Sequence, residues 1–400
     1  MLTMDMVYQA AYTLKNTIRK TDLIAAEGLY SDCQLYLKTE NLQLTGSFKL
    51  RGASYKIASL SKEEREKGVV ACSAGNHAQG VALAAKKNGI KATIFLPSVA
   101  PISKVEATRQ YGADIKMVDG IYDDAYEAAV KFQKETGSVF IHPFEDEEVI
   151  AGQGTIGLEL MEQLQDMEAV VVPVGGGGLI SGISFVIKKL NPKCKVYGVQ
   201  AEGAKSMYHS MKENKKCSLS SVSTFADGIA VKCPGEMTYE FCKDNVDEVV
   251  TVNDDEIAAA ILALMEKQKL VAEGAGAVSV AAVMSDKLPI KGKKVCAIVS
   301  GGNIDVNILS RVIDRGLLTS GRLSDLTIEL LDKPGQLKEV ADIIAEQGAN
   351  VIRVHHNQGG ENTDICGCYL RISMETRNKK HLDEIRATFR KRGYKLKENA

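Results

Sequence analysis

The hydrophobic pattern between residues 69 and 142 alternates short apolar runs with longer amphipathic segments. The apolar runs predict strands and the segments between them predict helices. The predicted strands are 69–72, 92–96, 115–118 and 139–142, and the predicted helices are 77–87, 103–111 and 122–136. Strands that alternate with helices indicate parallel pairing with right-handed crossovers. We therefore predict a compact α/β subdomain over residues 52–150.

A second alternating block lies on both sides of the first in the sequence. Its run at 169–174 is fully apolar, which favours a strand buried on both faces of a parallel sheet. Further strands are predicted at 34–38, 196–200, 248–252 and 294–299, and helices at 4–18, from near Gly154, and at 179–189, 254–268, 275–284 and 306–315. We predict one large domain of residues 1–51 and 151–316, into which the smaller subdomain is inserted.

The pattern changes after a short polar linker predicted at 317–324. Strands are predicted at 325–331, 350–358, 364–373 and 393–397, and helices at 335–348 and 378–391. This βαββαβ order is the ferredoxin-like arrangement. Residues 325–400 are therefore predicted to form a separate domain, and they show no catalytic constellation.

The amino-acid composition indicates which partners and which cellular compartment to expect. The 400 residues carry 50 basic and 51 acidic side chains, a net charge of −1, which gives no electrostatic basis for a nucleic-acid or membrane partner. The first twenty residues lack the basic region and continuous apolar core of a signal peptide. The nine cysteines include no CxxC pair. We expect a soluble protein of the cytoplasm.

Lys49 lies where a loop is predicted to turn into a helix. Ser47 is the predicted N-cap of a helix that continues to Leu60. A cation in the first turn of a helix lies at the unfavourable end of the helix dipole, which lowers its pKa. A neutral lysine amine is a nucleophile that can form a Schiff base with an aldehyde. The alternative is a solvated lysine at the start of a surface helix.

Three turns at the carboxyl ends of predicted strands supply anion-binding groups. The four glycines 175–178 precede a helix, so their amides can surround a phosphate, although they match neither the P-loop nor the dinucleotide fingerprint. The turn at 73–77 (SAGNH) offers amides and polar side chains for a carboxylate or a phenolate-like oxygen. The turn at 300–303 (SGGN) places a serine hydroxyl where it can meet a ring nitrogen or cap the next helix. A lysine, a phosphate site, an anion-binding loop and this hydroxyl fit pyridoxal phosphate.

Seven segments carry a specific family resemblance. They are GSFKLRGA, SAGNHAQG, HPFEDEEVIAGQGTIG, PVGGGGLISG, FADGIAV, VAEGAGA and CAIVSGGN. They resemble the threonine dehydratases (threonine ammonia-lyases), which are tryptophan-synthase-β-like pyridoxal phosphate enzymes of fold type II. The resemblance runs from residue 1 to about 315. It implies a two-domain α/β fold with open, twisted parallel sheets.

The resemblance also implies residue roles. Lys49 would bind the cofactor aldehyde and act as the base that takes the α-proton. The other implied cofactor contacts are Phe48 beside the ring, Asn76 at the ring oxygen, Gly175, Gly176, Gly177, Gly178 and Leu179 at the phosphate, Gly228 and Glu273 along the ring, and Ser300 at the ring nitrogen. The implied substrate loop comprises Ser73, Ala74, Gly75, Asn76 and His77.

The implied reaction is α,β-elimination. It would convert L-threonine to 2-oxobutanoate and ammonia, and L-serine to pyruvate. A neutral hydroxyl at the ring nitrogen does not favour a long-lived carbanion, which fits rapid loss of a β-leaving group. The role in isoleucine biosynthesis or in threonine catabolism stays open.

Alternative activities are an L-serine or 3-hydroxyaspartate dehydratase, a serine racemase, or an idle amino-acid-sensing module. The related serine racemase has a serine at the position of Ala74, and an alanine methyl cannot carry a proton. The divalent-metal site of the serine racemase family uses acidic residues after the strand that ends at Glu202, and here residues 203–208 contain no second carboxylate. His355 and His356 point to opposite faces of a predicted strand, so no metal site is predicted.

The C-terminal segment resembles an ACT domain. The resemblance is carried by DKPGQL at residues 332–337 and GANV at 348–351. It implies allosteric control by an amino-acid effector and assembly into a homodimer or homotetramer. The implied effector-binding residues are Gly335, Leu337, Asn350 and Val351. A plain dimerisation module is the alternative.

Overall fold

The computed structural model describes residues 1–100, 102–358 and 367–397. It divides into two compact units, Met1–Val306 and Asn307–Ala400. Among the described residues, no helix combines the length and apolar character needed to cross a membrane.

The first unit is built around a six-stranded sheet in the order β1-β2-β10-β7-β8-β9. Its strands are β1 (Leu23–Ala25), β2 (Gln34–Lys38), β7 (Ala169–Pro173), β8 (Lys195–Ala201), β9 (Glu248–Val252) and β10 (Lys294–Ile298). Only β1 pairs antiparallel; every other neighbouring pair is parallel. Every residue of β7 is buried, as a parallel strand with both faces covered requires.

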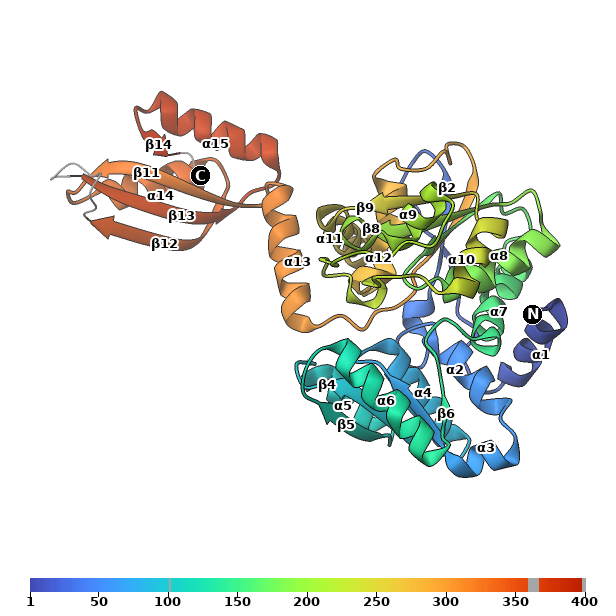
Figure 1. Cartoon of the computed structure of the whole chain (residues 1–400). Coiled ribbons are helices and arrows are strands. Elements are labelled where there is room, and N and C mark those ends of the chain that lie inside the picture. The colour runs from blue at the N-terminus through green and yellow to red at the C-terminus, as the bar shows by residue number, and fades with distance from the viewer. Residues whose placement is uncertain (101, 359–366, 398–400) are drawn as a thin grey trace. The chain divides into compact units, whose positions relative to one another are not determined.

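A four-stranded parallel sheet in the order β5-β4-β3-β6 belongs to the same unit. Its strands are β3 (Val69–Cys72), β4 (Ala92–Pro97), β5 (Asp114–Val118) and β6 (Val139–Phe140). All four come from one continuous stretch that lies between β2 and β7 in the sequence. Figure 1 shows this sheet with α6 against β4 and β5.

Helices surround both sheets of the first unit. They are α1 (Met4–Leu14), α2 (Lys49–Ala58), α3 (Lys62–Lys67), α4 (Asn76–Lys87), α5 (Ile102–Gln110), α6 (Tyr122–Thr136), α7 (Glu147–Gln163), α8 (Gly178–Leu190), α9 (Ser206–Glu213), α10 (Glu236–Asn245), α11 (Asp254–Ala263) and α12 (Gly274–Met284). Short 3-10 turns occur at η1 (Glu40–Leu42), η2 (Glu202–Ala204) and η3 (Asp227–Ile229), and a π turn, η4 (Leu264–Gln268), follows α11. The pattern analysis did not predict β1, α3, α9 or α10.

Helix α7 begins at Glu147, so the predicted start near Gly154 is wrong. Asp146 caps the helix by accepting a hydrogen bond from the Val149 amide at 3.0 Å. The glycines inside α7 serve close packing: a methyl group built at Gly152 would lie 2.7 Å from the Cα of Gly52 in α2. A glycine within a helix therefore marked an approach of two helices here, not a boundary.

The predicted N-cap at Ser47 is also wrong. Phe48 occupies the cap position of α2 and makes no side-chain capping bond. The Ser47 hydroxyl is buried without a hydrogen-bond partner, and the Ser47 backbone forms a bridge with Gly301. The start of α2 is thus fixed by backbone pairing to the turn after β10.

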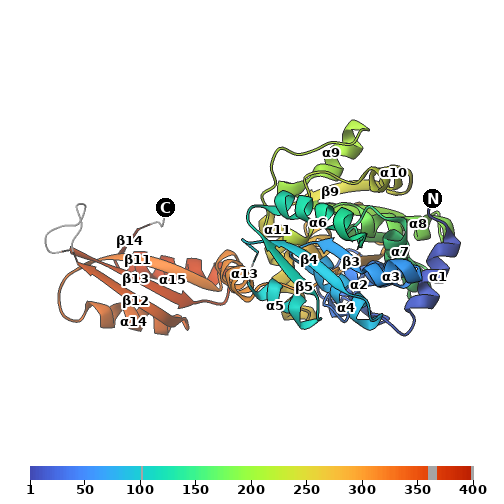
Figure 2. The same cartoon turned by 60° about the horizontal axis from the view of Figure 1, so that its bottom comes forward.

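The second unit has the predicted βαββαβ order. It comprises β11 (Leu323–Leu331), α14 (Gln336–Glu346), β12 (Asn350–Gln358), β13 (Gly367–Glu375), α15 (Lys379–Lys391) and β14 (Lys395–Lys397). Figure 2 shows the antiparallel sheet in the order β12-β13-β11-β14. Side chains alternate between buried and partly exposed along β11 because one face of the sheet packs on the two helices. Residues 359–366 and 398–400 of the predicted C-terminal domain lie outside the described residues.

The helix that precedes β11 is longer than predicted. Helix α13 (Val306–Thr319) extends beyond residue 315 into the predicted linker, which leaves only residues 320–322 between α13 and β11. The first helix is shorter than predicted: α1 ends at Leu14, whereas the prediction extended to residue 18.

A network of buried ion pairs includes Arg51, which is two residues after Lys49 in the sequence. Its members are Lys38, Glu40, Arg51 and Glu159, and we call it the Arg51 network. Arg51 is fully buried, and its guanidinium donates to both carboxylate oxygens of Glu40 at 2.8 and 2.9 Å. It also donates to both oxygens of Glu159 at 2.6 and 2.9 Å. Lys38 Nζ donates to Glu159 at 2.5 Å. Because Glu40 lies in η1 and Glu159 in α7, the network ties the start of α2 to both.

Charge pairing outweighs burial at Glu40, whereas at Lys38 burial lowers the pKa despite the nearby Glu159 carboxylate. Burial alone would raise the pKa of Glu40, but the Arg51 guanidinium holds that pKa below its ordinary value. Removing one partner would leave the remaining carboxylates buried without compensation. The network is therefore a structural requirement for the placement of Lys49.

We expect Arg51→Met to lower the free energy of unfolding by about 3–5 kcal/mol, because it leaves Glu40 without its main partner. Arg109→Met is the matched control, since the Arg109 side chain is 58% exposed. Urea unfolding of both variants and the parent at one pH measures the difference. Equal unfolding free energies for the two variants would contradict the role given to the network.

Candidate active site

Lys49 and the glycine turn are joined by the segment after β6. The Lys49 amine donates to the carbonyl of Pro143 at 2.8 Å. The next residue, Phe144, lies against the glycine turn: a methyl group built at Gly176 would lie 2.3 Å from its ring. Only glycine fits this approach, so the turn and Lys49 lie on either side of residues 143–144.

Ser300 and Asn76 approach Lys49 from other elements. The Phe48 amide donates to the Ser300 carbonyl at 3.1 Å, and Ser300 is the second residue after β10, which ends at Ile298. A methyl group built at the next residue, Gly301, would lie 3.2 Å from the Asn76 amide nitrogen and 2.3 Å from a Glu273 oxygen. The carboxyl end of β10 therefore meets the start of α4.

Two hydrogen bonds fix the orientation of the Asn76 side chain. Its Nδ2 donates to Glu273 at 2.6 Å, and its Oδ1 accepts from Asn303 Nδ2 at 2.7 Å. Asn303 also donates to the Thr45 carbonyl at 2.8 Å, which joins the lysine loop to the same cluster.

The segment around Gly228 connects Glu273 to the glycine turn. A methyl group built at Gly228 would lie 3.6 Å from Glu273, and one built at Gly175 would lie 3.0 Å from the Cα of Ile229. Gly228 and Ile229 are consecutive, so their segment joins Glu273 to the glycine turn. The contacts therefore form a ring. They lead from Lys49 to Ser300, Asn76 and Glu273, reach the glycine turn, and return to Lys49 through Phe144. The structure thus brings together residues from all seven segments that carried the family resemblance.

The glycine turn has the geometry of an anion site. Gly177 caps α8 with a φ of +101°, a conformation that glycine adopts without strain. The first amides of a helix have no partner within it and lie at the positive end of the helix dipole. Leu179 is buried in the first turn of α8. One phosphate can therefore bind through backbone amides alone.

The predicted substrate loop is only partly available. Ser73 Oγ accepts from the Gly75 amide at 3.2 Å, and a methyl group built at Gly75 would meet no atom within 4 Å. Ala74 is half-buried against the core of the smaller sheet. The His77 imidazole is 3% exposed and its Nε2 lies 2.8 Å from the Ile141 carbonyl, whereas its Nδ1 is buried without a hydrogen-bond partner among the described residues. Burial lowers the pKa of His77 to about 3, so the ring is neutral.

Lys49 and Glu273 both titrate near neutrality. Burial lowers the pKa of Lys49 to about 8, and the Glu273 carboxylate acts against that decrease. The sequence predicted a lowered pKa from the helix dipole, whereas burial is the main cause in the structure. Burial, and then Asp227, raise the pKa of Glu273 to about 7. At neutral pH the site therefore holds a weakly basic amine near a carboxyl group that is partly protonated.

Four residues at the site were given no role by the sequence analysis. They are Lys104, Phe144, Asp227 and Asn303. Lys104 of α5 forms an ion pair with Asp227 of η3, which joins the smaller sheet's helices to the Gly228 turn. Phe144 and Asn303 lie within segments that carried the family resemblance, but no local pattern predicts which distant residue each contacts.

The predicted effector residues do not converge within one chain. Gly335 caps α14 and Leu337 lies in its first turn, 51% exposed. Asn350 and Val351 begin β12, beyond the other end of that helix. A helix of this length spans roughly 16 Å, so one small ligand cannot reach all four in a single chain.

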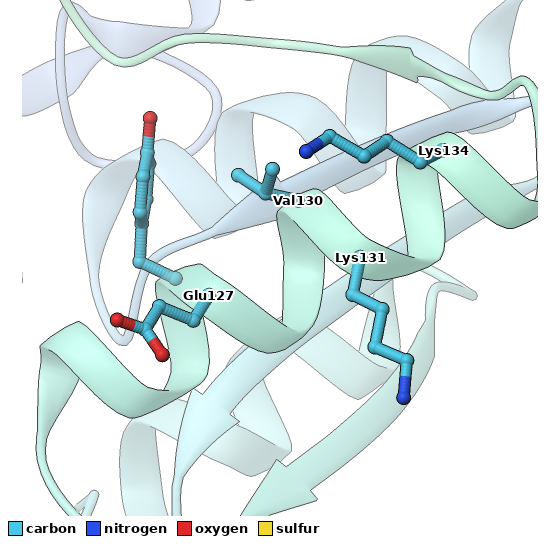
Figure 3. A pocket seen from close by; sticks show the side chains of 5 residues that line it. Glu127, Val130, Lys131 and Lys134 are labelled. Carbon is cyan, nitrogen blue, oxygen red and sulfur yellow. The ribbon is translucent and has the colours of Figure 1, made fainter.

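A surface hollow on α6 lies apart from these residues in the sequence (Figure 3). It is lined by Tyr126, Glu127, Val130, Lys131 and Lys134. All five belong to one helix, and none is a predicted site residue. The hollow therefore supports no ligand assignment.

Comparison with known proteins identifies the relatives of this chain. The family model described as "Pyridoxal-phosphate dependent enzyme" matches residues 14–301. The L-threonine ammonia-lyase of Thermotoga maritima is 53% identical over 399 residues, which cover 99% of each chain. The processed threonine deaminase isoform 2 of Solanum lycopersicum is 39% identical, with a TM-score of 0.74 over 78% of this chain and 89% of that one. Maize serine racemase is 36% identical, with a TM-score of 0.74 over 79% of this chain and 98% of that one.

We expect the reactivity of the Lys49 amine to rise with a midpoint near pH 8. Only the neutral amine is nucleophilic, so labelling of the cofactor-free protein should be slow below this pH and fast above it. Glu273→Gln should lower the midpoint, because the carboxylate raises the pKa of Lys49. Acylation rates of the Lys49 peptide, followed by mass spectrometry, measure both midpoints. An unchanged midpoint in Glu273→Gln would refute the coupling.

Proposed function

The chain belongs to the pyridoxal-phosphate dependent enzyme family, and from this premise we propose that it is an L-threonine ammonia-lyase. The net reaction converts L-threonine to 2-oxobutanoate and ammonia, and L-serine to pyruvate and ammonia. The observation that carries the proposal is Lys49: a lysine with a pKa lowered to about 8, joined by contacts to a glycine phosphate turn and to Ser300. The relatives named L-threonine ammonia-lyase and threonine deaminase support the choice of substrate.

The residues present fit pyridoxal phosphate. Methyl groups at Gly176 and Gly178 would collide with Phe144, so both positions require glycine. The backbone amides of this turn therefore have no side chains beside them where a phosphate would bind. Ser300 is buried, and its hydroxyl makes only a long contact of 3.4 Å to the Ala275 carbonyl, which leaves it available to a ring nitrogen. In this assignment Asn76 binds the ring oxygen, Phe48 packs beside the ring, and Gly228 and Glu273 lie along it.

Lys49 performs two roles in the proposed reaction. It holds the aldehyde of the cofactor, and after substrate binding its freed amine takes the proton from the substrate Cα. A base is most effective when its pKa lies near the working pH, and a value of about 8 meets that condition. Bound pyridoxal phosphate supplies an electron sink for the electron pair left on Cα.

The turn before α4 orients the substrate by binding its carboxylate. Residues 73–77 form the turn before α4, where backbone amides and the helix dipole favour a carboxylate. With the carboxylate held there, Lys49 takes the proton from Cα, the bond from Cβ to oxygen breaks, and the hydroxyl gains a proton and leaves as water. In the released product a proton from solvent adds to Cβ, water adds to Cα, and nitrogen leaves as ammonia, so that the keto acid remains.

A serine racemase is the second candidate, because maize serine racemase is a structural neighbour. Racemisation needs a second acid on the face opposite Lys49. Ala74, at the position where that family has a serine, carries no exchangeable side-chain proton. Elimination is therefore favoured over racemisation.

Lys49→Ala should abolish formation of 2-oxobutanoate from L-threonine, with a loss of at least about a thousandfold in turnover. Lys131→Ala is the control, because the Lys131 side chain is 79% exposed on α6. A coupled keto-acid assay measures both, and chiral analysis of products from L-serine tests racemisation. Normal turnover of the Lys49→Ala variant, or D-serine as the main product, would refute the assignment.

We further propose that the C-terminal unit is an ACT domain that controls the rate through an amino-acid effector. The βαββαβ order and the sheet order support the domain type. Strand β12 is an edge strand, and its Ile352 and Val354 are exposed, which favours pairing with a second copy. A homodimer or homotetramer would also bring Gly335 and Leu337 of one chain near Asn350 and Val351 of another.

The cellular setting belongs to the same proposal. The described cysteines are all free, which favours a reducing compartment such as the cytoplasm. A biosynthetic or a catabolic role follows from which amino acid acts as effector.

One of the amino acids isoleucine, valine, threonine or serine should change the threonine turnover of the full chain by about 5-fold or more, the usual scale of allosteric coupling. Leu337→Ala should weaken this response and leave basal turnover unchanged, because Leu337 is exposed at the start of α14. Initial rates over effector concentration measure both. The absence of any response to all four amino acids would exclude this form of control.

A further inference from the structure

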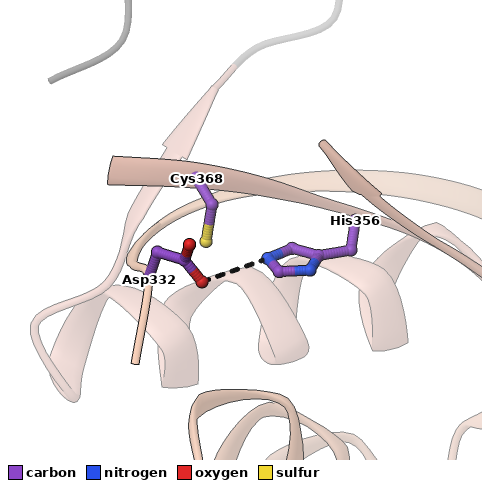
Figure 4. A group of neighbouring side chains, drawn as sticks. All are labelled: Asp332, His356 and Cys368. Atoms are coloured by element: carbon purple, nitrogen blue, oxygen red, sulfur yellow. Dashed lines mark ion pairs between the residues drawn. The ribbon is translucent and has the colours of Figure 1, made fainter. Parts of the chain in front are cut away.

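The C-terminal unit brings three metal-binding side-chain types together. Asp332, His356 and Cys368 each offer one ligand atom, and these atoms all lie within 4.8 Å of one another. Figure 4 shows the Asp332 carboxylate, the His356 ring and the Cys368 sulfur directed toward a common point. Among the described residues, this is the one group of three such side chains with this geometry.

Strand register explains why the three side chains meet. Cys368 of β13 pairs with Leu330 of β11, and Leu370 pairs with His356 of β12. Directly paired residues share a face of the sheet, and residues two apart on one strand share it too. Cys368 and His356 therefore face the helices together, and Asp332 directly follows the end of β11 beside them.

The three ligands differ in exposure in a way that suits an ion entering from solvent. Cys368 is 1% exposed and belongs to the core under the helices. The side chains of His356 and Asp332 are 46% and 41% exposed. The ion would thus have one buried anchor and two ligands at an open side.

A fourth residue orients the carboxylate. Gln358 Nε2 donates to one oxygen of Asp332 at 2.6 Å, and the other oxygen lies 4.0 Å from His356 Nε2. Outer hydrogen bonds of this kind fix the direction of a metal ligand. Asp332 therefore presents its second oxygen toward His356.

We propose that Asp332, His356 and Cys368 bind one zinc ion, with a fourth position open to water or a small ligand. Thiolate and imidazole are ligands of zinc, whereas magnesium and calcium prefer oxygen ligands alone. On binding, the Cys368 thiol releases its proton to solvent, a zinc–sulfur bond forms, and no electron is transferred. Tetrahedral zinc with ligand distances of about 2.0–2.3 Å holds its ligand atoms about 3.5 Å apart. Ligand atoms that lie up to 4.8 Å apart must therefore approach one another by up to about 1 Å when the ion binds.

This site revises the prediction that the chain has no metal ligands. His355 and His356 do point to opposite faces, as their partners Arg371 and Leu370 show. The partners of His356 come instead from β13 and the end of β11, which no local spacing reveals. The ion would link the turn before α14 to β12 and β13.

Zinc titration of the full chain after chelator treatment tests this proposal, with cobalt as a spectroscopic probe. We expect about one equivalent per chain and a thiolate-to-cobalt absorption band. His356→Ala and Cys368→Ser should each weaken binding at least about tenfold, and Cys368→Ser should remove the band. His355→Ala is the matched control, because it removes the neighbouring histidine from the opposite face.

His356→Ala keeps the test valid if Cys368→Ser fails to fold, because His356 is half-exposed and outside the core. Binding that is equal in the parent, His356→Ala and His355→Ala, or the absence of stoichiometric binding by the parent, would overturn the proposal.

Discussion

The placement of Lys49 depends on the Arg51 network. Arg51 is buried with Glu40, and the two charges are stable there only because each carboxylate oxygen receives a hydrogen bond from the guanidinium. Glu159 extends the pairing to α7 and, through Lys38, to β2. Because Arg51 lies in the first turn of α2, this costly arrangement fixes the helix that carries the catalytic amine. The same burial lowers the pKa of Lys49, so structural and chemical constraints have a common origin.

Close backbone approaches assemble the rest of the site. Phe144 lies so near the glycine turn that only glycine fits at Gly176, and Gly301 lies equally near Glu273. These approaches bring amides, a hydroxyl and a carboxyl group to the carboxyl ends of parallel strands, where open α/β sheets bind ligands. The site therefore results from the sheet topology of the first unit, and its electrostatics result from the exclusion of water around Lys49 and Glu273.

Local patterns predicted much of the fold but not its long-range contacts. The bounds of β2 and α6 matched the prediction because each has a clear period and clear ends. The predicted start of α7 was wrong because the glycines inside this helix pack closely against α2, which lies far away in the sequence. Nothing in the sequence indicated that the His77 ring packs toward the Ile141 carbonyl. The contact of Phe144 with the glycine turn joins two distant segments. The cluster of Asp332, His356 and Cys368 depends on strand register, which no single segment encodes.

The central claim is that Lys49 is the residue to which pyridoxal phosphate is attached. Borohydride reduction of the cofactor-loaded protein, followed by peptide mass spectrometry, tests it directly because reduction makes the attachment permanent. The account predicts the added mass of the reduced cofactor on the peptide that contains Lys49 and on no other lysine. A modified lysine elsewhere, with Lys49 unmodified, would contradict it.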